Sequence, residues 1–314
     1  MKSLLLSTVA AFGLATAASA DITVYSAGPG GLANRLAAGF TDATGIGVNL
    51  YQATTGKVMA RLEAEAANPQ ADVVVSASWG TATDMDAQGL LLAYTSPNAA
   101  KVPDFLKTET AVAQGVAALA IGWNPASGTT KPTDWADLAK PEYKDLVTMP
   151  DPAQSGSAFE LVAAIEGSLG NGLFDDLAAN GALVAGANAQ ALNPVLQGAK
   201  AAIIGGVDYK LYGANAKGEA IEVVLPTSGT VVAPRPAMIL KSSQHQDEAK
   251  KFIDYILSDE GQEMVASTFL MPSRADVGAK RPTIAELKLL PTDSAAANAQ
   301  RDTILTAFAA TFAQ

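Results

Sequence analysis

The stretch "DITVYSAGPGGLANRLAAGFTDATGIGVNLYQ", Asp21–Gln52, decides the fold class. Its first part, ITVYSA, is rich in residues that favour strands, the middle part has apolar residues at helical spacing and ends at Gly45, and GVNLYQ is again strand-like. A strand, a helix and a second strand in this order predict a βαβ unit. The helical run KVMARLEAEAA and the apolar run ADVVVSA continue the alternation, which indicates an α/β fold with a largely parallel sheet.

A second series of the same kind follows farther along the chain. It contains the strand-like segments 115–124, 146–152, 200–208, 221–229 and 235–243, and the helical segments 133–143, 157–170 and 247–269. The last of these is amphipathic, with Ala249, Phe252 and Ile253 on one face. Because no flexible tether separates the two series, we expect strands to cross a hinge between two lobes.

The length of the chain also favours two lobes. Single hydrophobic cores stop growing at about 250 to 300 residues, and this chain has 314. The expected organisation is a first lobe from 21–115 and 226–280, a second lobe from 116–225, and C-terminal helices at 281–314 that pack back on the second lobe.

The N-terminal residues 1–20 are typical of a cleaved secretory signal peptide. Lys2 precedes a short apolar run, and Ala18, Ser19 and Ala20 form an A-x-A cleavage site. The run is shorter than the roughly 20 apolar residues that span a bilayer. The mature protein is therefore expected in a bacterial periplasm.

Composition excludes several classes of function. The chain has no cysteine, which removes disulfides, thiol catalysis and thiolate metal sites. Its net charge of −10 argues against nucleic acid as a partner. A single histidine, His245, leaves a serine hydrolase without a base beside its nucleophile and makes a histidine-rich metal site impossible.

Two glycine motifs resemble nucleotide sites but lack essential parts. Gly28-Pro29-Gly30-Gly31-Leu32-Ala33 fits G-x-G-x-x-A, yet the acid expected at the end of the next strand is missing, since that strand ends Tyr51-Gln52-Ala53. In ATTGKV, Val58 stands where a phosphate loop needs Ser or Thr. The remaining interpretations are glycines that let backbone amides approach a ligand, and a helix capped by Thr54 or Thr55.

The stretch "DPAQSGSAFELV", 151–162, combines a helix start with a cluster of small polar groups. Ser157 and Glu160 have the spacing of a capping box, which leaves Ser155 and Gly156 unexplained. Free backbone N–H groups, hydroxyl donors and the positive end of a helix dipole would converge here. We therefore predict an anion site built without a basic side chain.

Several segments resemble solute-binding proteins of ABC importers, in the branch of ferric-ion, hexose-phosphate and 2-aminoethylphosphonate binders. The resemblance is carried by DITVYSAG, NPQADVVVSAS, PDPAQSGSAF and AMILKSSQHQDEAKKFIDYILSDEGQ. It implies a type II periplasmic binding fold, in which two lobes close over a ligand and dock onto an inner-membrane permease. It further implies a monomeric, non-enzymatic protein without a cofactor. An exported hydrolase that uses Asp208 or Asp151 stays open as the competing class.

The resemblance also implies the ligand contacts. A loop like SGSAF seats a phosphate in such proteins, so the expected contacts in this chain are Ser155, Gly156, Ser157, Ser78, Asn188, Asp208, Tyr209, Thr55, Trp79, Thr227 and Ser228, with Arg235 as a further candidate. Asp208 is expected to face the part of the ligand beyond the phosphate. The function predicted from this set is the capture of a small phosphorylated or phosphonate solute.

A ferric-ion binder with a synergistic anion is the alternative. Ferric-ion members carry two adjacent tyrosines after the equivalent strand, whereas this chain has Asp208, Tyr209 and a separated Tyr212. Fe(III) prefers anionic oxygen ligands, and these three residues would supply at most one carboxylate and two phenols. No metal site is therefore included in the preferred interpretation.

Overall fold

The computed structural model of the chain describes residues 20–170 and 172–313. The expected signal peptide, residues 1–20, lies outside the described residues except for Ala20, so it stays a prediction. Within the described ranges, no helix combines the length and the apolar character that crossing a membrane requires.

The described residues form one mixed sheet of ten strands. The strand order is β2-β1-β3-β9-β4-β7-β5-β6, and β8 and β10 pair with β4 outside this path. The strands are β1 Ile22–Ser26, β2 Val48–Gln52, β3 Val73–Val75, β4 Ala111–Trp123, β5 Val147–Met149, β6 Leu183–Val184, β7 Ala202–Val207, β8 Glu222–Val224, β9 Val232–Ile239 and β10 Met271–Pro272.

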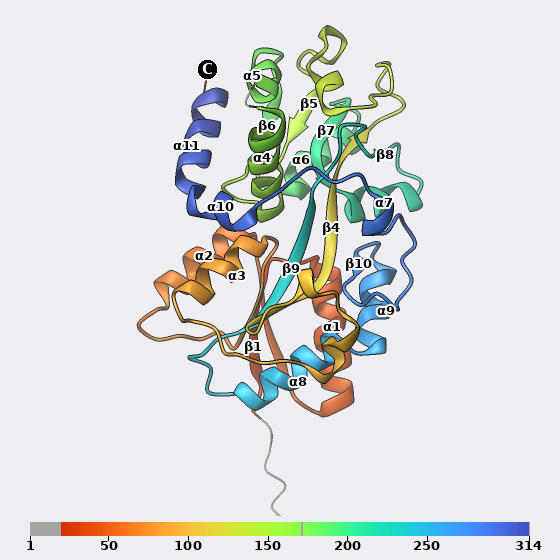
Figure 1. Ribbon diagram of the computed structural model, residues 1–314. Coiled ribbons are helices and arrows are strands. Elements are labelled where there is room, and N and C mark those ends of the chain that lie inside the picture. Colours follow the sequence, from red (N-terminus) through yellow and green to blue (C-terminus); the bar gives the residue numbers. More distant parts are fainter. Residues whose placement is uncertain (1–19, 171, 314) are drawn as a thin grey trace, which may run out of the picture.

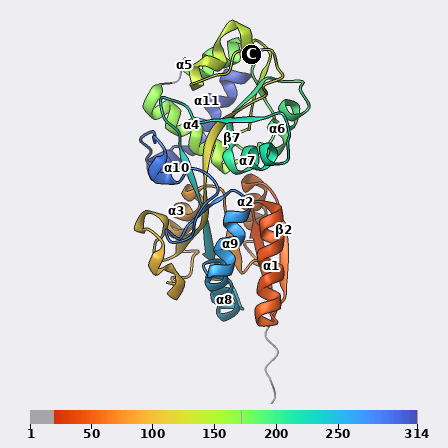
Figure 2. The same cartoon turned by 90° about the vertical axis from the view of Figure 1, so that its right-hand side faces the viewer.

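Helices cover both faces of this sheet (Figures 1 and 2). They are α1 Gly30–Thr44, α2 Thr55–Ala64, α3 Trp79–Ala87, α4 Gly156–Leu169, α5 Gly172–Ala179, α6 Asn188–Leu196, α7 Asp208–Ala216, α8 Gln246–Ile256, α9 Asp259–Ser267, α10 Ser294–Ala299 and α11 Arg301–Phe312. The α/β class expected from the sequence is thus confirmed.

Two of the expected helices differ in the structure. The segment 133–143 forms two short 3-10 helices, Trp135–Ala139 and Pro141–Tyr143, because Pro141 begins a new turn. The amphipathic segment 247–269 is divided into α8 and α9. The division falls at Ser258, whose side chain accepts a hydrogen bond of 3.0 Å from the Gly261 N–H and so caps a new helix.

Strand β4 belongs to both halves of the sheet. Its first part, Ala111–Ala118, pairs with β9, and its second part, Leu119–Trp123, pairs with β7 and β8. Figure 1 shows β4 and β9 running between two bodies of the molecule. We call the body with β1–β3, α1–α3, α8 and α9 the first lobe, and the body with β5–β8 and α4–α7 the second lobe. The exact residue boundaries expected from the sequence stay a prediction.

Each lobe contains a parallel group of strands, and antiparallel strands join the groups. The pairs β1–β2 and β1–β3 are parallel in the first lobe, as are β5–β6 and β5–β7 in the second. The connecting pairs β3–β9, β4–β9 and β4–β7 are antiparallel. The carboxyl ends of the two parallel groups face each other, which places the loops after these strands between the lobes.

The C-terminal helices contact both lobes. Helix α11 packs on α4 and α5 of the second lobe, and α10 contacts α4 but also α3 of the first lobe. Asn298 of α10 lies so close to Gly80 of α3 that a Cβ atom at Gly80 would stand 2.8 Å from the Asn298 Oδ1. The C-terminal segment therefore bridges the lobes on the side of α3 and α4.

Candidate functional site

A cavity of about 180 Å³ lies between the lobes, where the parallel strands end. The loops that line it follow β1, β2 and β3 in the first lobe and β5, β6 and β7 in the second. Ligands of open α/β sheets bind outside the carboxyl ends of the strands. The lining residues are Ala27, Gly28, Ala53, Thr54, Thr55, Ala77, Gln154, Ser155, Ser157, Ala187, Asn188, Ala189, Gln190, Tyr209, Lys210 and Arg235.

The N-termini of four helices meet at this cavity. Residues that begin or precede α2, α4, α6 and α7 are among its lining residues, and each of these helices has at least nine residues. The first N–H groups of a helix have no partner within the helix, and the helix dipole places partial positive charge there. The electrostatic potential contributed by the backbone therefore favours an anion.

Helix α4 begins two residues earlier than a capping box at Ser157 would require. Ser155 is the N-cap, and its hydroxyl accepts a hydrogen bond of 3.3 Å from the Ala158 N–H. The expected capping box of Ser157 and Glu160 is thus wrong. Ser157 instead lies in the first turn with its hydroxyl 3.2 Å from that of Ser155, at the edge of the cavity.

Asn188 holds the two serine hydroxyls in place. Its amide nitrogen donates to the Ser155 hydroxyl at 2.8 Å and to the Ser157 hydroxyl at 3.3 Å, while its amide oxygen accepts from the Val207 N–H at 3.0 Å. Both serine oxygens accept from Asn188, and one hydroxyl donates to the other, so one hydroxyl proton remains available to donate toward the cavity. The structure brings Ser155, Ser157 and Asn188 together, in the arrangement expected for donors to an anion.

Arg235 supplies a buried positive charge to the cavity. Its side chain is 2% exposed, and no carboxylate in the described part of the chain lies within ion-pair distance of it. One guanidinium nitrogen donates to the Ala27 carbonyl at 3.2 Å, and the Nε atom is buried without a hydrogen-bond partner. A buried charge is costly unless it is paired. Arg235 therefore keeps the capacity to pair with an anionic group at the cavity.

The position of Arg235 follows from two prolines. Pro234 and Pro236 of β9 lie opposite β4 where the register of the β4–β9 pair shifts, between Ala113 and Val116. Proline cannot donate to a ladder, and it is found at such bulges, which often redirect a side chain next to a functional site. Arg235 was only a further candidate in the sequence analysis, although the Pro-Arg-Pro pattern within a strand indicates a bulge that can redirect the arginine side chain.

Tyr209 and Lys210 line the cavity from the start of α7. The Arg235 guanidinium lies over the Tyr209 ring, 5.2 Å from its centroid. Burial, and to a smaller degree the positive charge of Arg235, lowers the pKa of Lys210. Burial also raises the pKa of Tyr209. Lys210 was missed by sequence reasoning, because one lysine near a helix start has no distinctive pattern.

The lobes touch each other at Gly156, beside the cavity. A Cβ atom at this position would stand 2.9 Å from the Ser78 Cβ and 3.0 Å from the Thr55 Oγ1 of the first lobe. The Thr55 hydroxyl is buried and lacks a partner in the described structure, so it is a second unpaired polar group at the cavity. Only glycine permits this close approach of the two lobes.

Asp208 does not line the cavity. Its carboxylate is fully buried, forms an ion pair with Arg281, and accepts from the Ala118 and Tyr209 N–H groups at 3.0 and 2.7 Å. Burial raises the pKa of Asp208 to about 6, against the opposing effect of Arg281. The expectation that Asp208 faces the ligand is therefore corrected, because the Asp208 carboxylate binds Arg281 and two backbone N–H groups within the protein.

Tyr212 is also directed elsewhere. Its ring stacks on Phe269 with 6.4 Å between centroids, and the Arg281 guanidinium lies 5.4 Å from its centroid. Of the residues considered for a ferric ion, only Tyr209 lines the cavity. No cluster of three His, Cys, Asp or Glu side chains suited to a metal occurs in the residues that the structure describes.

Ser78 contacts the opposite lobe rather than the cavity. Its hydroxyl donates to the Glu160 carboxylate at 2.5 Å, and Ser294 donates to the other oxygen of this carboxylate at 3.0 Å. Burial raises the pKa of Glu160. Trp79, the first residue of α3, packs against the hydrophobic core and is not among the lining residues. The contact between Ser78 and Glu160 therefore joins the lobes.

Thr227 and Ser228 have a structural partner in Asp134. The Thr227 hydroxyl donates to Asp134 at 2.7 Å, and Ser228 donates to it through its hydroxyl at 2.6 Å and its N–H at 2.9 Å. These bonds fix the turn to the 3-10 helix Trp135–Ala139. Neither residue lines the cavity, so the expectation that they contact the ligand is not supported by their positions.

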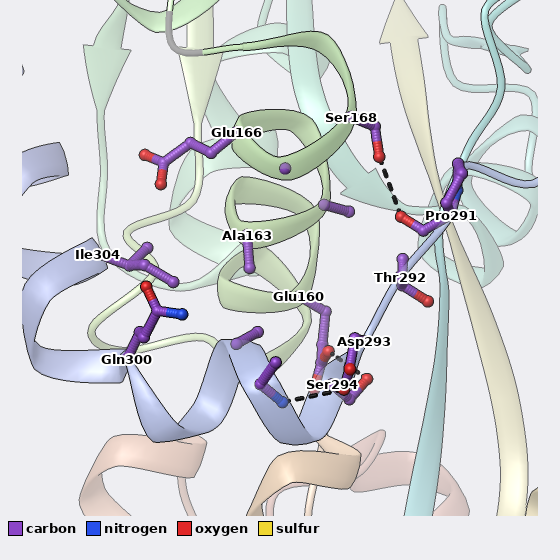
Figure 3. A pocket seen from close by; sticks show the side chains of 14 residues that line it. Glu160, Ala163, Glu166, Ser168, Pro291, Thr292, Asp293, Ser294, Gln300 and Ile304 are labelled. Atoms are coloured by element: carbon purple, nitrogen blue, oxygen red, sulfur yellow. Dashed lines mark hydrogen bonds between the residues drawn. The ribbon is translucent and has the colours of Figure 1, made fainter.

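A larger cavity, of about 560 Å³, lies outside the interlobe site, between α4 and the C-terminal segment (Figure 3). Ser168 bonds Pro291 across it, and Glu160 bonds Ser294 at its base. Glu160, Glu166 and Asp293 contribute three carboxyl groups to its lining. These carboxyl groups, with no basic side chain among the described residues of the lining, make the larger cavity unsuitable for an anion.

Comparison with known proteins places the chain in a family. The family model "Bacterial extracellular solute-binding protein" matches residues 68–298, well over half of the chain. A putative 2-aminoethylphosphonate-binding periplasmic protein of Salmonella typhimurium is 29% identical over 256 residues, which are 76% of this chain and 73% of that protein. The major ferric iron-binding protein of Neisseria meningitidis is 29% identical over 270 residues, 81% of this chain and 80% of that protein.

Solved structures share the fold. The periplasmic binding protein AfuA from Actinobacillus pleuropneumoniae, solved with fructose-6-phosphate, superposes with a TM-score of 0.86 at 22% identity and covers 94% of this chain and 99% of that one. Its type II periplasmic binding fold is the fold that the sequence predicted. Family and neighbours are binding proteins rather than enzymes, and they include proteins of ABC importers. This chain belongs to the family of bacterial extracellular solute-binding proteins.

Proposed function

We propose that this protein captures a small phosphorylated or phosphonate solute between its lobes. The observation that carries the proposal is Arg235, a buried guanidinium without a carboxylate partner in the described structure, at a cavity where four helices begin. A tetrahedral oxyanion would pair with Arg235 and accept hydrogen bonds from the Ser155 or Ser157 hydroxyl and the first N–H groups of α4. Each charge-assisted bond contributes roughly 1.5–3 kcal/mol.

The cavity combines contacts from both lobes, which supports a role in delivery. Thr55 and Gly28 belong to the first lobe, and Ser155, Asn188 and Tyr209 to the second. A ligand that contacts both lobes shifts the population of conformations toward the closed one. The closed, loaded protein then docks onto an inner-membrane ABC permease. We further propose that residues 1–20 are cleaved on export and that the protein works in the periplasm.

The chemistry of the lining favours an anion over a ferric ion. None of the described residues that line the cavity carries a carboxylate, and Tyr209 is its single phenol. A ferric ion needs several anionic oxygen ligands. Arg235 and Lys210 would repel a cation. The 2-aminoethylphosphonate-binding and fructose-6-phosphate-bound relatives are consistent with an organic phosphonate or phosphate as the solute.

Calorimetry and thermal unfolding of the purified mature protein test the proposal. Phosphate, methylphosphonate, a hexose phosphate and Fe(III) are added separately, and free phosphate is measured in parallel. We expect one or more oxyanions to bind with one-to-one stoichiometry without release of phosphate. Ligand at about 100 times its Kd stabilises the folded state by about 2.7 kcal/mol. Turnover of a phosphate ester, or binding of Fe(III) alone with a tyrosinate colour, would contradict the proposal.

A matched pair of variants localises the anion. Asn188→Asp places a negative charge beside Ser155 and Ser157 with almost no change of shape, and we expect it to abolish oxyanion binding. Gln197→Glu makes the same change of charge at the other end of α6 and should leave binding within about threefold of wild type, because exposed charges beyond roughly 8–10 Å are screened. Equal effects of both variants would mean that the anion binds elsewhere.

A further inference from the structure

An outer groove adjoins the interlobe cavity. This groove, of about 320 Å³, lies between the start of α1 and the helices α6 and α7, and it shares Ala189, Tyr209 and Lys210 with the cavity. Figure 2 shows α6 and α7 on the side of the molecule where α1 lies. The two spaces meet at Tyr209 and Lys210, so adjoining parts of one molecule can occupy them.

The inner cavity is the smaller of the two spaces. Its volume is about 180 Å³, against about 320 Å³ for the outer groove. A substituent that the inner cavity does not hold can therefore extend into the adjoining groove.

The chemistry of the outer groove differs from that of the cavity. Aliphatic and small residues make up much of its wall, among them Leu32, Leu192, Leu196, Gly31 and Gly213. Its polar side chains are Asn193, Lys217 and Glu219, which are exposed to water, and Thr268, whose hydroxyl donates to the Val265 carbonyl, besides Tyr209 and Lys210 at the border with the cavity. The aliphatic wall can remove apolar surface of a ligand from water.

The charges of the site are unsuited to an ammonium group. Arg235 and Lys210 lie at the cavity and Lys217 lies on the groove, whereas the single carboxylate among the described residues that line either space belongs to the exposed Glu219. The buried Asp208 is paired with Arg281, and Asp151 accepts hydrogen bonds from the Ala153 N–H and the Gln154 side chain. A cationic substituent would meet repulsion without a partner.

We infer that the outer groove is a second subsite, which takes an apolar, uncharged substituent of the phosphonate or phosphate whose anionic group binds at Arg235. The inference rests on the proposed function and adds a class of ligand to it: alkyl phosphonates and phosphate monoesters with an apolar body, rather than amino phosphonates or sugar phosphates. The cationic amine of 2-aminoethylphosphonate distinguishes that compound from the class named here.

Two nearly isosteric ligands test the inference by calorimetry. Propylphosphonate and 2-aminoethylphosphonate differ only in a terminal methyl or ammonium group. We expect propylphosphonate to bind about tenfold or more tightly than the amine, and also about tenfold more tightly than methylphosphonate, because each CH₂ moved out of water contributes about 0.8 kcal/mol. Tighter binding of 2-aminoethylphosphonate or of fructose 6-phosphate would overturn the inference and leave anion capture intact.

A substitution in the groove separates the two subsites. Gly213 lies on α7 with open space around it, because an added Cβ would have only the Phe269 ring as a neighbour, at 3.9 Å. Gly213→Leu should remove the advantage of propylphosphonate while leaving methylphosphonate affinity within about threefold, since the new side chain fills only the groove. Gly167→Leu on α4, also in open space, is the control and should change neither affinity.

The outcomes separate the two proposals. If Gly213→Leu weakens methylphosphonate and propylphosphonate equally, the groove is not a separate subsite and the inference fails. If none of the oxyanions binds to the wild-type protein, the proposed function itself fails, and the inference fails with it.

Discussion

Replacing Arg235 with methionine should have opposite effects on the free and the loaded protein. In the free protein the change removes one hydrogen bond to Ala27 and the contact with the Tyr209 ring, which together contribute about 2–5 kcal/mol. It also removes a buried guanidinium without a carboxylate partner in the described structure, whose desolvation costs several kcal/mol. The free energy of unfolding should therefore stay constant or increase.

In the loaded protein the same variant loses its pairing with the anion. Truncating one partner of a buried, hydrogen-bonded charge pair costs about 2–5 kcal/mol, which raises the Kd by about 30-fold to several thousandfold. Calorimetry with methylphosphonate gives this Kd, and thermal unfolding without ligand gives the stability. At this chain length each kcal/mol changes the Tm by about 2–4 °C.

A second buried arginine serves as the control. Arg274 is 6% exposed but forms ion pairs with Asp259 and Asp276, both at 2.7 Å. Arg274→Met should lower the Tm and leave the affinity unchanged, because it breaks pairs within the protein and lies away from the cavity. If Arg235→Met instead lowers the Tm and retains wild-type affinity, Arg235 is a structural residue and the reasoning is refuted.

Three further variants test other parts of the structure. Gly156→Ala should weaken methylphosphonate binding about tenfold or more and increase the radius of gyration in X-ray scattering, because the added methyl group separates the lobes, whereas Gly167→Ala in the same helix should do neither. Glu160→Gln should have wild-type stability at pH 4 and exceed it at pH 8 in urea unfolding. The pKa of Glu160 is raised in the folded state, so Glu160 stabilises the fold in its protonated form, below the ordinary pKa of 4.5. This stabilisation is lost as the pH rises through the pKa of the folded state. Equal pH profiles of the variant and the wild type would contradict this. Asp208→Asn should lower the free energy of unfolding by about 3–5 kcal/mol, because Arg281 loses its carboxylate, yet change methylphosphonate affinity by less than about threefold; the reverse pattern would return Asp208 to the ligand.

Local sequence patterns predicted the fold and one part of the site, namely the SGS segment and Asn188. The βαβ alternation after Asp21 and the presence of a helix after the SGS segment can be read from short stretches, although the cap is Ser155 rather than the expected Ser157. Asn188 was also expected, and the structure places it against both serines.

The rest of the site depends on contacts between distant segments. Asp208 has the same neighbours in sequence whether it faces a ligand or Arg281, and these two residues are 73 positions apart. Likewise, Glu160 fits a capping box locally but bonds Ser78, which lies in the other lobe. Arg235 becomes informative only when the structure shows that the described carboxylates are all out of its reach.

Strand β4 determines how the protein unfolds and how it responds to proteolysis, because it belongs to both lobes. Since Ala111–Ala118 completes the core of one lobe and Leu119–Trp123 that of the other, neither lobe is a contiguous, self-sufficient folding unit. Cutting the chain within β4 should unfold both lobes together, and heating should melt them in one cooperative transition. Because β4 belongs to the cores of both lobes, proteolysis within this one strand would inactivate the whole protein.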